Sequence, residues 1–129
     1  MTQEEKQLLL KVLSAMLPYH VKVKIWLKDG TTEEGFLDLE HNYADVLRDT
    51  FYYNEIKDIK PYLRPMSSMT EDERKEYNEY LFHGASIGLM SNTATAYELI
   101  DWLNSHHFDY RGLIIMGLAI EAPEGMYKI

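Results

Sequence analysis

The spacing of apolar residues changes near residue 20, from a helical period to a period of two. Between Thr2 and Pro18 apolar positions recur every three or four residues, which predicts an amphipathic helix. Thr2 is followed three residues later by Glu5, a capping box that marks the start of this helix. From Val21 to Leu27 every second residue is aliphatic. The residues between them, together with Lys28 just past the strand, are expected to point outward: Lys22, Lys24, Trp26 and Lys28. The alternation predicts a strand with its aliphatic residues buried and its lysines exposed.

Turn signals divide the next part of the chain into further short strands. Asp29-Gly30 is a favoured hairpin pair, and it leads into a second strand with inward residues at Gly35, Leu37 and Leu39. More strands are expected at residues 43–47, at residues 51–53, and around Ile56, Ile59, Tyr62 and Leu63. We expect Pro61 and Pro65 to end the sheet, because proline cannot donate to a hydrogen-bond ladder. Five short antiparallel strands most economically close into a small barrel, since closure removes exposed edges.

The second half of the chain shows helical patterns. Thr70 and Glu73 form another capping box, which opens a helix that ends near Phe82. A loop is expected over residues 83–92, then a helix from Thr93 or Thr95 to about His107 and a short one from Asp109 to Gly117. The inward candidates of the two longer helices are Tyr77, Tyr80, Leu81, Ala96, Leu99, Ile100 and Leu103. Residues 118–121 and 126–129 flank a Pro-Gly turn and predict a short closing hairpin.

The predicted fold class is therefore α+β, with an N-terminal helix, a small five-stranded antiparallel barrel and a mainly helical C-terminal lobe. Residues 1–66 hold the helix and barrel, and residues 67–129 form the helical lobe of the same folding unit. Residues 3–63 resemble the Sm-like variety of SH3-type barrel through the Asp29-Gly30 turn and Gly35-x-Leu37. Because the Asp-x-x-Met-Asn and Arg-Gly motifs of that family are missing, the resemblance implies the shape without its RNA site.

The composition and charge of the chain indicate the compartment and the partners to expect. The chain has no cysteine, which excludes disulfides and thiolate chemistry and suits a reducing compartment. Its start lacks the charged region and long apolar core of a signal peptide, and we expect a cytoplasmic protein without a membrane partner. The net charge is −8, with 9 basic and 11 acidic side chains in residues 1–66 and 4 basic and 10 acidic in residues 67–129. This balance disfavours nucleic acid as a partner.

Three segments of the sequence show a second resemblance to known proteins. They are Lys60-Pro-Tyr-Leu-Arg-Pro-Met-Ser-Ser-Met-Thr-Glu71, Asp109-Tyr-Arg-Gly-Leu-Ile114 and Glu121-Ala-Pro-Glu-Gly-Met-Tyr127. They resemble short uncharacterised proteins of gut anaerobic bacteria and of their prophages or mobile elements. The resemblance implies a phage-related setting, in which accessory and assembly proteins are common, and it implies no activity.

The enzyme hypothesis rests on His106, His107 and Asp109, since imidazole with carboxylate can bind a divalent metal. Adjacent helical residues point about 100° apart, so the two histidines cannot face one ion from a regular helix. His106 and His107 also suit a helix C-terminus, and Asp109 suits an N-cap. No phosphate-binding loop, dinucleotide fingerprint or nucleophile elbow is present. We therefore expect a protein that is not an enzyme and has no cofactor. A metal-dependent hydrolase is the third hypothesis.

The outward face of the first strand is the best candidate binding site. Cations interleaved with aromatic rings suit single-stranded nucleic acid, with phosphates neutralised and bases stacked. The candidate residues are Lys22, Lys24, Trp26, Lys28 and Tyr52, with Tyr53, Lys57 and Lys60 as neighbours. The alternative is an ordinary solvated face with Trp26 covered by another element, which the net charge favours. The second half could also be a winged helix-turn-helix. In its recognition helix, Arg111 alone could contact a base or a phosphate.

A protein-interaction role is the first prediction. Ten tyrosines, two tryptophans and seven methionines exceed what a small core readily buries, and these residue types are enriched at interfaces. We expect a non-enzymatic accessory protein that binds a protein partner or itself. Single-stranded nucleic-acid binding by the strand face is the alternative.

Overall fold

The computed structural model describes residues 2–37, 56–86 and 93–127, and its first helix has the predicted start. Helix α1, Gln3–Met16, begins at a complete capping box. The Glu5 amide donates to the Thr2 hydroxyl at 3.1 Å, and the Thr2 amide donates to the Glu5 carboxylate at 2.8 Å. A short 3-10 turn, η1 (Leu17–Tyr19), leads into the sheet.

The sheet has four strands in the order β2-β1-β3-β4. They are β1 (Val21–Leu27), β2 (Thr32–Leu37), β3 (Ile56–Leu63) and β4 (Ile120–Glu121). Strand β1 pairs antiparallel with both β2 and β3, whereas β4 pairs parallel with β3. The Asp29-Gly30 turn joins β1 to β2 as predicted, with Gly30 at a φ of 89° and Thr31 bound to the Asp29 carboxylate.

The prediction of a five-stranded antiparallel barrel is wrong. Among the described residues the sheet is open and mixed, because its fourth strand comes from the C-terminal part of the chain and runs parallel to β3. In place of the predicted closing hairpin, residues 120–121 pair with Tyr62 and Leu63 of β3, and the Ala122 amide donates to the Leu63 carbonyl at 2.8 Å. Residues 124–127 form a turn, and residues 128–129 of the predicted hairpin lie outside the described residues. Leu39 and the strands expected at residues 43–47 and 51–53 lie outside the described residues.

Pro61 does not end the sheet but lies inside β3, opposite Val23 of β1. Strand β4 pairs with β3 only from Tyr62 onward, so the outer edge of β3 needs no donor at Pro61. The preceding donor on β3, the Ile59 amide, is bound by the Asp58 carboxylate at 2.9 Å. Proline and a local side-chain bond thus blunt an edge that could otherwise pair with another strand.

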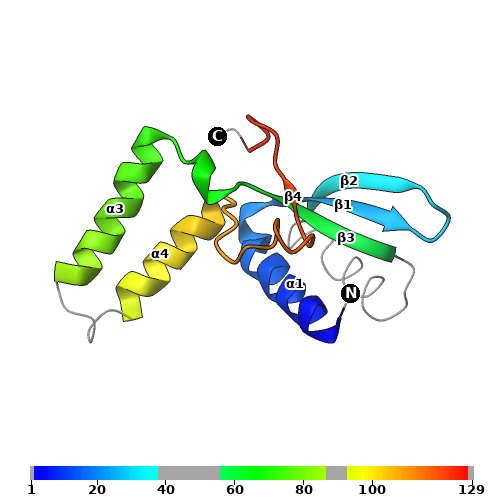
Figure 1. The fold of residues 1–129 in the computed structure, drawn as a ribbon, viewed down its shortest axis with the longest axis horizontal. Helices are drawn as coiled ribbons and strands as arrows, with labels where there is room; N and C mark the ends of the chain where they lie inside the picture. The colour runs from blue at the N-terminus through cyan, green and yellow to red at the C-terminus, as the bar shows by residue number, and fades with distance from the viewer. Residues whose placement is uncertain (1, 38–55, 87–92, 128–129) are drawn as a thin grey trace.

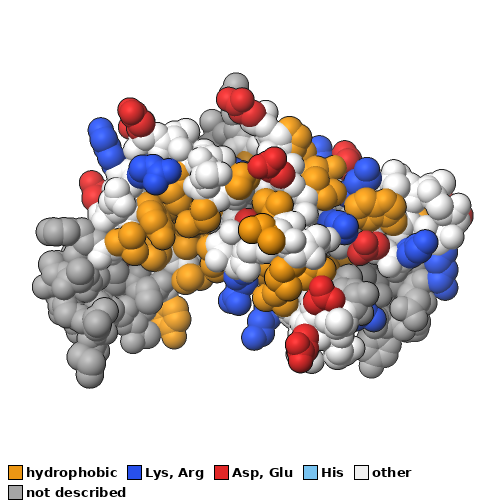
Figure 2. Space-filling model, in the orientation of Figure 1, with side chains coloured by type: hydrophobic (Ala, Val, Ile, Leu, Met, Phe, Trp, Pro, Cys, Tyr) orange, Lys and Arg blue, Asp and Glu red, His pale blue; other side chains and the backbone are white. Residues whose placement is uncertain are grey.

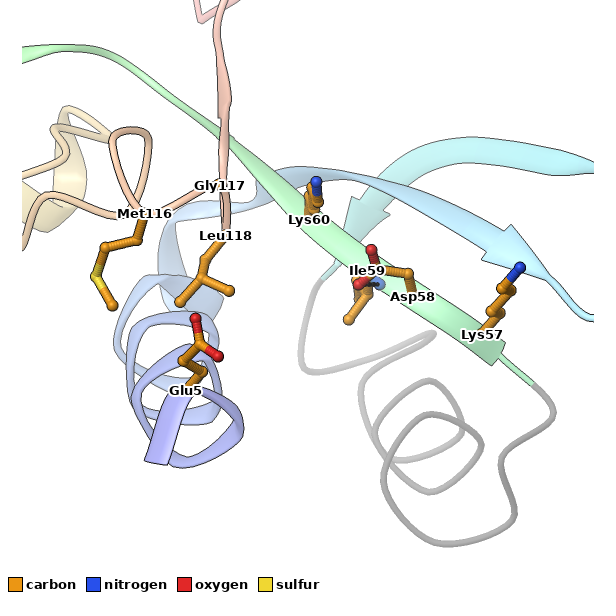
Figure 3. A pocket seen from close by; sticks show the side chains of 8 residues that line it. All are labelled: Glu5, Lys57, Asp58, Ile59, Lys60, Met116, Gly117 and Leu118. Atoms are coloured by element: carbon orange, nitrogen blue, oxygen red, sulfur yellow. Dashed lines mark hydrogen bonds between the residues drawn. The ribbon is translucent and has the colours of Figure 1, made fainter. Parts of the chain in front are cut away.

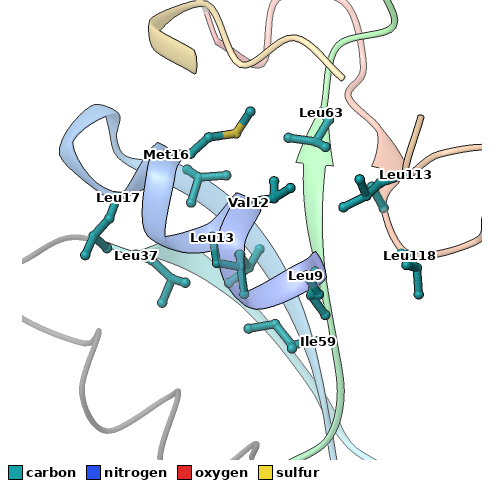
Figure 4. Close-up of a cluster of buried hydrophobic side chains, with 13 residues drawn as sticks. Leu9, Val12, Leu13, Met16, Leu17, Leu37, Ile59, Leu63, Leu113 and Leu118 are labelled. Carbon is teal, nitrogen blue, oxygen red and sulfur yellow. The ribbon is translucent and has the colours of Figure 1, made fainter. Parts of the chain in front are cut away.

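The main core lies between α1 and one face of the sheet (Figures 1 and 4). Its buried members come from α1, η1, three strands and the C-terminal segment: Leu9, Val12, Leu13, Met16, Leu17, Val21, Val23, Leu37, Ile59, Leu63, Leu113, Leu118 and Ala119. The predicted inward face of β1 is confirmed at Val21 and Val23, while Ile25 and Leu27 are half-buried at the core margin. On the other face Lys22 and Lys24 are half-buried rather than exposed, and Lys28 is exposed.

Two helices form the opposite end of the molecule (Figure 1). The capping box of Thr70 and Glu73 is confirmed, but α3, Glu71–Ser86, runs into the segment predicted as a loop. Helix α4 spans Thr93–Ser105. Between them lies a second core of Trp102, Leu103 and Phe108, packed against Met66, Met69, Tyr77, Tyr80, Leu99 and Tyr110.

The predicted inward position is wrong for two residues of these helices. Leu81 and Ile100 are 46% and 38% exposed, whereas the indole of Trp102 packs in the second core and donates to Glu76 at 2.7 Å. The side chain of Ala96 lies outside the described part of the structure.

The short helix predicted from Asp109 to Gly117 is a series of turns. Asp109 does cap it, since its carboxylate accepts from the Leu113 and Ile114 amides at 2.8 and 2.9 Å. Gly112 has a φ of 77° within the segment, which a right-handed helix cannot contain. Gly117 has the same φ but closes the turn as a helix cap would, with the Leu118 amide donating to the Leu113 carbonyl at 2.9 Å. Within the described ranges, no helix has the length and apolar character needed to cross a bilayer.

Candidate functional site

The outer face of the sheet brings together side chains from three strands. Lys24 of β1 lies opposite Glu34 of β2 and Lys60 of β3. Trp26 of β1 lies between Thr32 and Asp58 in the same way, and Lys22 is opposite Phe36. The predicted residues Lys22, Lys24 and Trp26 therefore share one face, and register adds Lys60 to them.

Two lysines pack on one indole ring. The ammonium nitrogens of Lys24 and Lys60 lie 5.3 and 5.6 Å from the centre of the Trp26 ring, and that of Lys22 lies 5.7 Å from the Phe36 ring. These are cation–π distances. Trp26 is half-buried, so its indole is neither fully exposed nor covered by another lobe; the lysines of its own face lie over it.

The carboxylates of this face bind other groups. Glu34 accepts a hydrogen bond from the Tyr62 hydroxyl, which raises the pKa of Tyr62 to about 12. Asp58 binds the Ile59 amide. Among the described residues, neither Lys24 nor Lys60 forms a salt bridge.

The other predicted members of this site have different positions. Lys28 lies in the turn after β1 and is exposed. Lys57 is the extra residue of a bulge, because Trp26 pairs with Asp58 while Leu27 pairs with Ile56. Tyr52 and Tyr53 lie outside the described residues.

The predicted metal candidates bind three different partners. His106 Nδ1 lies 3.1 Å from Glu73, His107 Nε2 donates to the Tyr19 carbonyl at 2.8 Å, and Asp109 caps the following turn. Across the described ranges no three His, Asp or Glu side chains are placed to hold an ion. The two histidines thus link distant parts of the chain, whereas Asp109 holds a local turn.

Arg64 and Glu73 form a junction between β3 and α3 that the sequence did not predict. Both terminal nitrogens of Arg64 donate to the Glu73 carboxylate at 2.7 Å, and the guanidinium lies 4.3 Å from the centre of the Phe108 ring. Hydrogen bonds from Arg64 lower the pKa of Glu73 to about 2. The only sequence signal was the Glu73 capping position, which uses one carboxylate oxygen and leaves its long-range partner unidentified.

Tyr127 forms a second unpredicted contact, between the C-terminal segment and the sheet. Its hydroxyl accepts from the Lys22 amide at 2.9 Å and donates to the Tyr62 carbonyl at 2.6 Å. Its ring stacks on His107, with 3.7 Å between centroids. Burial raises the pKa of Tyr127 and lowers that of His107. The hydroxyl thus joins β1 to β3 just beyond Val23 and Pro61, the last pair of their ladder.

The turns of residues 112–117, here called the apolar turn, expose large aliphatic side chains. Leu113 is fully buried in the main core, whereas Ile115 is 94% exposed and Met116 is 45% exposed. The prediction of a short helix here did not indicate this exposure, because a helix would have been expected to bury one side of the segment. Figure 2 shows apolar side chains gathered over the helical end and the middle of one face, with basic and acidic side chains interspersed over the sheet end.

A hollow of about 370 Å³ lies beside the apolar turn. Met116 and Leu118 lie on one side of it, β3 lies on the other, and Glu5 of α1 completes it (Figure 3). Its lining residues are Glu5, Lys57, Asp58, Ile59, Lys60, Met116, Gly117 and Leu118. An apolar protrusion therefore adjoins a concave surface.

The chain is thus an α+β protein built on an open mixed sheet, with lysines and aromatic rings on one sheet face and an exposed apolar turn. Comparison with protein-family models, with curated proteins and with solved structures finds no match. The functional argument therefore depends on the geometry of the chain itself.

Proposed function

We propose that this protein is a non-enzymatic protein-interaction module whose main contact is the apolar turn. The observation that carries the proposal is the exposure of Ile115, 94%, on a segment whose backbone is fixed on both sides. The Asp109 carboxylate holds the turn through two amides, and the buried side chain of Leu113 anchors it to the core.

A fixed turn lowers the entropy lost when a partner binds, because its backbone is already ordered. Burying an isoleucine side chain contributes about 1.5–3 kcal/mol, and methionine adapts to irregular partner surfaces. The hollow next to Met116 could receive a side chain of the partner. A protruding apolar side chain beside a hollow with a mixed charged and apolar lining is typical of interaction sites.

The resemblance of residues 60–71, 109–114 and 121–127 to proteins of phages and mobile elements supports an accessory role. In this reading the protein acts by binding another protein of the element or of its host, or by binding itself.

Site-specific photo-crosslinking in the native host tests the proposal. A photoreactive amino acid replaces Ile115 in one strain and Leu81, another exposed apolar residue, in a matched control strain. We expect a discrete adduct from position 115 and none from position 81, and its mass identifies a second copy or a different partner. No discrete adduct at 115, or the same adducts at both positions, would contradict the proposal.

A further inference from the structure

Lys24 and Lys60 form a like-charge pair on neighbouring strands. They are direct cross-strand partners, a position in which two charges of the same sign disfavour strand pairing. The chain has 21 acidic side chains against 13 basic ones, so a pairing of opposite charges would have been easy to provide. Lys24 also faces Glu34 on its other side, but in the described part of the chain neither lysine forms a salt bridge. An anionic ligand would therefore relieve the repulsion between the two ammonium groups.

The nearest carboxylates keep their charge but are hydrogen-bonded to other groups, and among the described residues neither forms a salt bridge with these lysines. Glu34, opposite Lys24, is bound to the Tyr62 hydroxyl, and Asp58 is bound to a backbone amide. Each acid is thus held by a neutral donor of its own sheet. In the described residues both ammonium groups are left to contact only the Trp26 ring.

The indole adds a stacking surface to these two charges. Trp26 lies on the same face and remains partly accessible to solvent. The lysine contacts with its ring are weak, so a ligand that neutralises the ammonium groups can draw them from the ring and take their place.

We propose that this face binds single-stranded nucleic acid, with Lys24 and Lys60 neutralising phosphates and Trp26 stacking on a base. Cations with an aromatic ring on an open sheet surface are the usual elements of such sites. Lys60 lines the hollow beside the apolar turn as well as facing Trp26, but the proposal uses neither Ile115 nor Met116, so it does not depend on the apolar turn.

The distribution of acidic residues is compatible with this ligand. Residues 67–129 hold 10 acidic and 4 basic side chains, and helices α3 and α4 of that part form the end of the molecule opposite the sheet (Figure 1). At physiological ionic strength, interactions over more than about 8 Å are largely screened. The acidic helices therefore lower the affinity without blocking the site, and binding should be weak and strongly salt-dependent.

The test is fluorescence anisotropy of a labelled oligothymidylate across a salt series. The test variant is Lys24→Gln with Lys60→Gln, and the control is Lys11→Gln with Lys75→Gln, which removes the same charge from exposed sites on α1 and α3. We expect the test variant to bind at least tenfold more weakly at low salt and the control within about twofold. Each lost phosphate contact should reduce the slope of log K against log salt by about 0.7, so the test variant should lose about 1.4.

A second readout follows Trp26 itself. In a Trp102→Phe background, whose folding is verified by circular dichroism, the oligonucleotide should quench the remaining tryptophan fluorescence. Three results would overturn the proposal: no binding at low salt, equal losses in the test and control variants, or binding of duplex DNA or polyglutamate as tight as that of the single strand. The last result would identify a general polyanion surface or an acidic protein as the partner.

Discussion

The charges at the Arg64–Glu73 junction and those on the outer sheet face are arranged in opposite ways. At the junction a guanidinium and a carboxylate form two hydrogen bonds, and the side chains are only 20% and 14% exposed. On the sheet face two ammonium groups oppose each other, and the carboxylates nearby bind other groups. The difference separates charges that hold the fold together from charges that, on our proposal, bind a ligand.

The largest effect is expected at the junction. Replacing Arg64 by alanine leaves the Glu73 carboxylate largely buried without its partner and removes the contact with Phe108. Because the pair retains some solvent access, we expect a loss of about 2–3 kcal/mol in the free energy of unfolding. Urea denaturation measures it, with Arg74→Ala on the exposed side of α3 as a control that should change by less than about 0.5 kcal/mol. Equal losses in both variants would show that the junction has no special role.

The same junction should make stability depend on pH. The pKa of Glu73 in the folded protein is about 2, below its ordinary value of 4.5. Its stabilising effect is therefore fully present above pH 4.5 and is lost as the pH falls toward 2. The difference in unfolding free energy between the wild type and Glu73→Gln should shrink over that interval, and a difference that is constant from pH 6 to pH 2.5 would contradict the assigned pairing.

The contact made by Tyr127 is the next largest. Tyr127→Phe keeps the ring on His107 but leaves the Lys22 amide and the Tyr62 carbonyl without the hydroxyl. An unsatisfied buried polar group costs about 1–3 kcal/mol, so we expect a loss of about 1–2 kcal/mol. Hydrogen exchange should locate the change at the Lys22 amide. If exchange there is unaltered, the hydroxyl does not join the two strands.

The contrast also shows what the sequence could predict. Some predictions depend only on residues a few positions apart in the sequence. These are helix α1, strand β1 and both capping boxes, and they are confirmed. Strand β4 is two residues long and gains its place from pairing with a strand some 60 residues earlier, so local patterns predicted a hairpin instead. The partners of Arg64 and Tyr127 are long-range in the same sense.

The candidate site was predictable in part. Alternation along β1 placed Lys22, Lys24 and Trp26 on one face, but strand register was needed to add Lys60. The apolar turn was missed because Asp109 suggested a helix cap before the apolar residues 113–116, whereas Gly112 adopts a positive φ that breaks the helix. Glycine permits that conformation without requiring it, so sequence alone does not decide between the two.

A small effect of the opposite sign is expected on the sheet face. Lys60→Gln removes one member of the like-charge pair with Lys24, so it should stabilise the protein by about 0.2–1 kcal/mol at low salt. The gain should decline as salt screens the repulsion. Lys57→Gln at the neighbouring bulge removes the same charge without relieving a cross-strand pair and serves as the control. A loss of stability in Lys60→Gln would show that this lysine supports the fold.

The unfolding free energy of Ile115→Ser tests most directly whether the apolar turn is a surface for a partner. Because Ile115 is 94% exposed, we expect a change of less than about 0.5 kcal/mol. Leu113→Ala, two residues earlier in the same turn and fully buried, should lose about 2–5 kcal/mol. A loss of about 1 kcal/mol or more in Ile115→Ser would mean that this side chain packs within the protein, which would contradict the proposed contact surface.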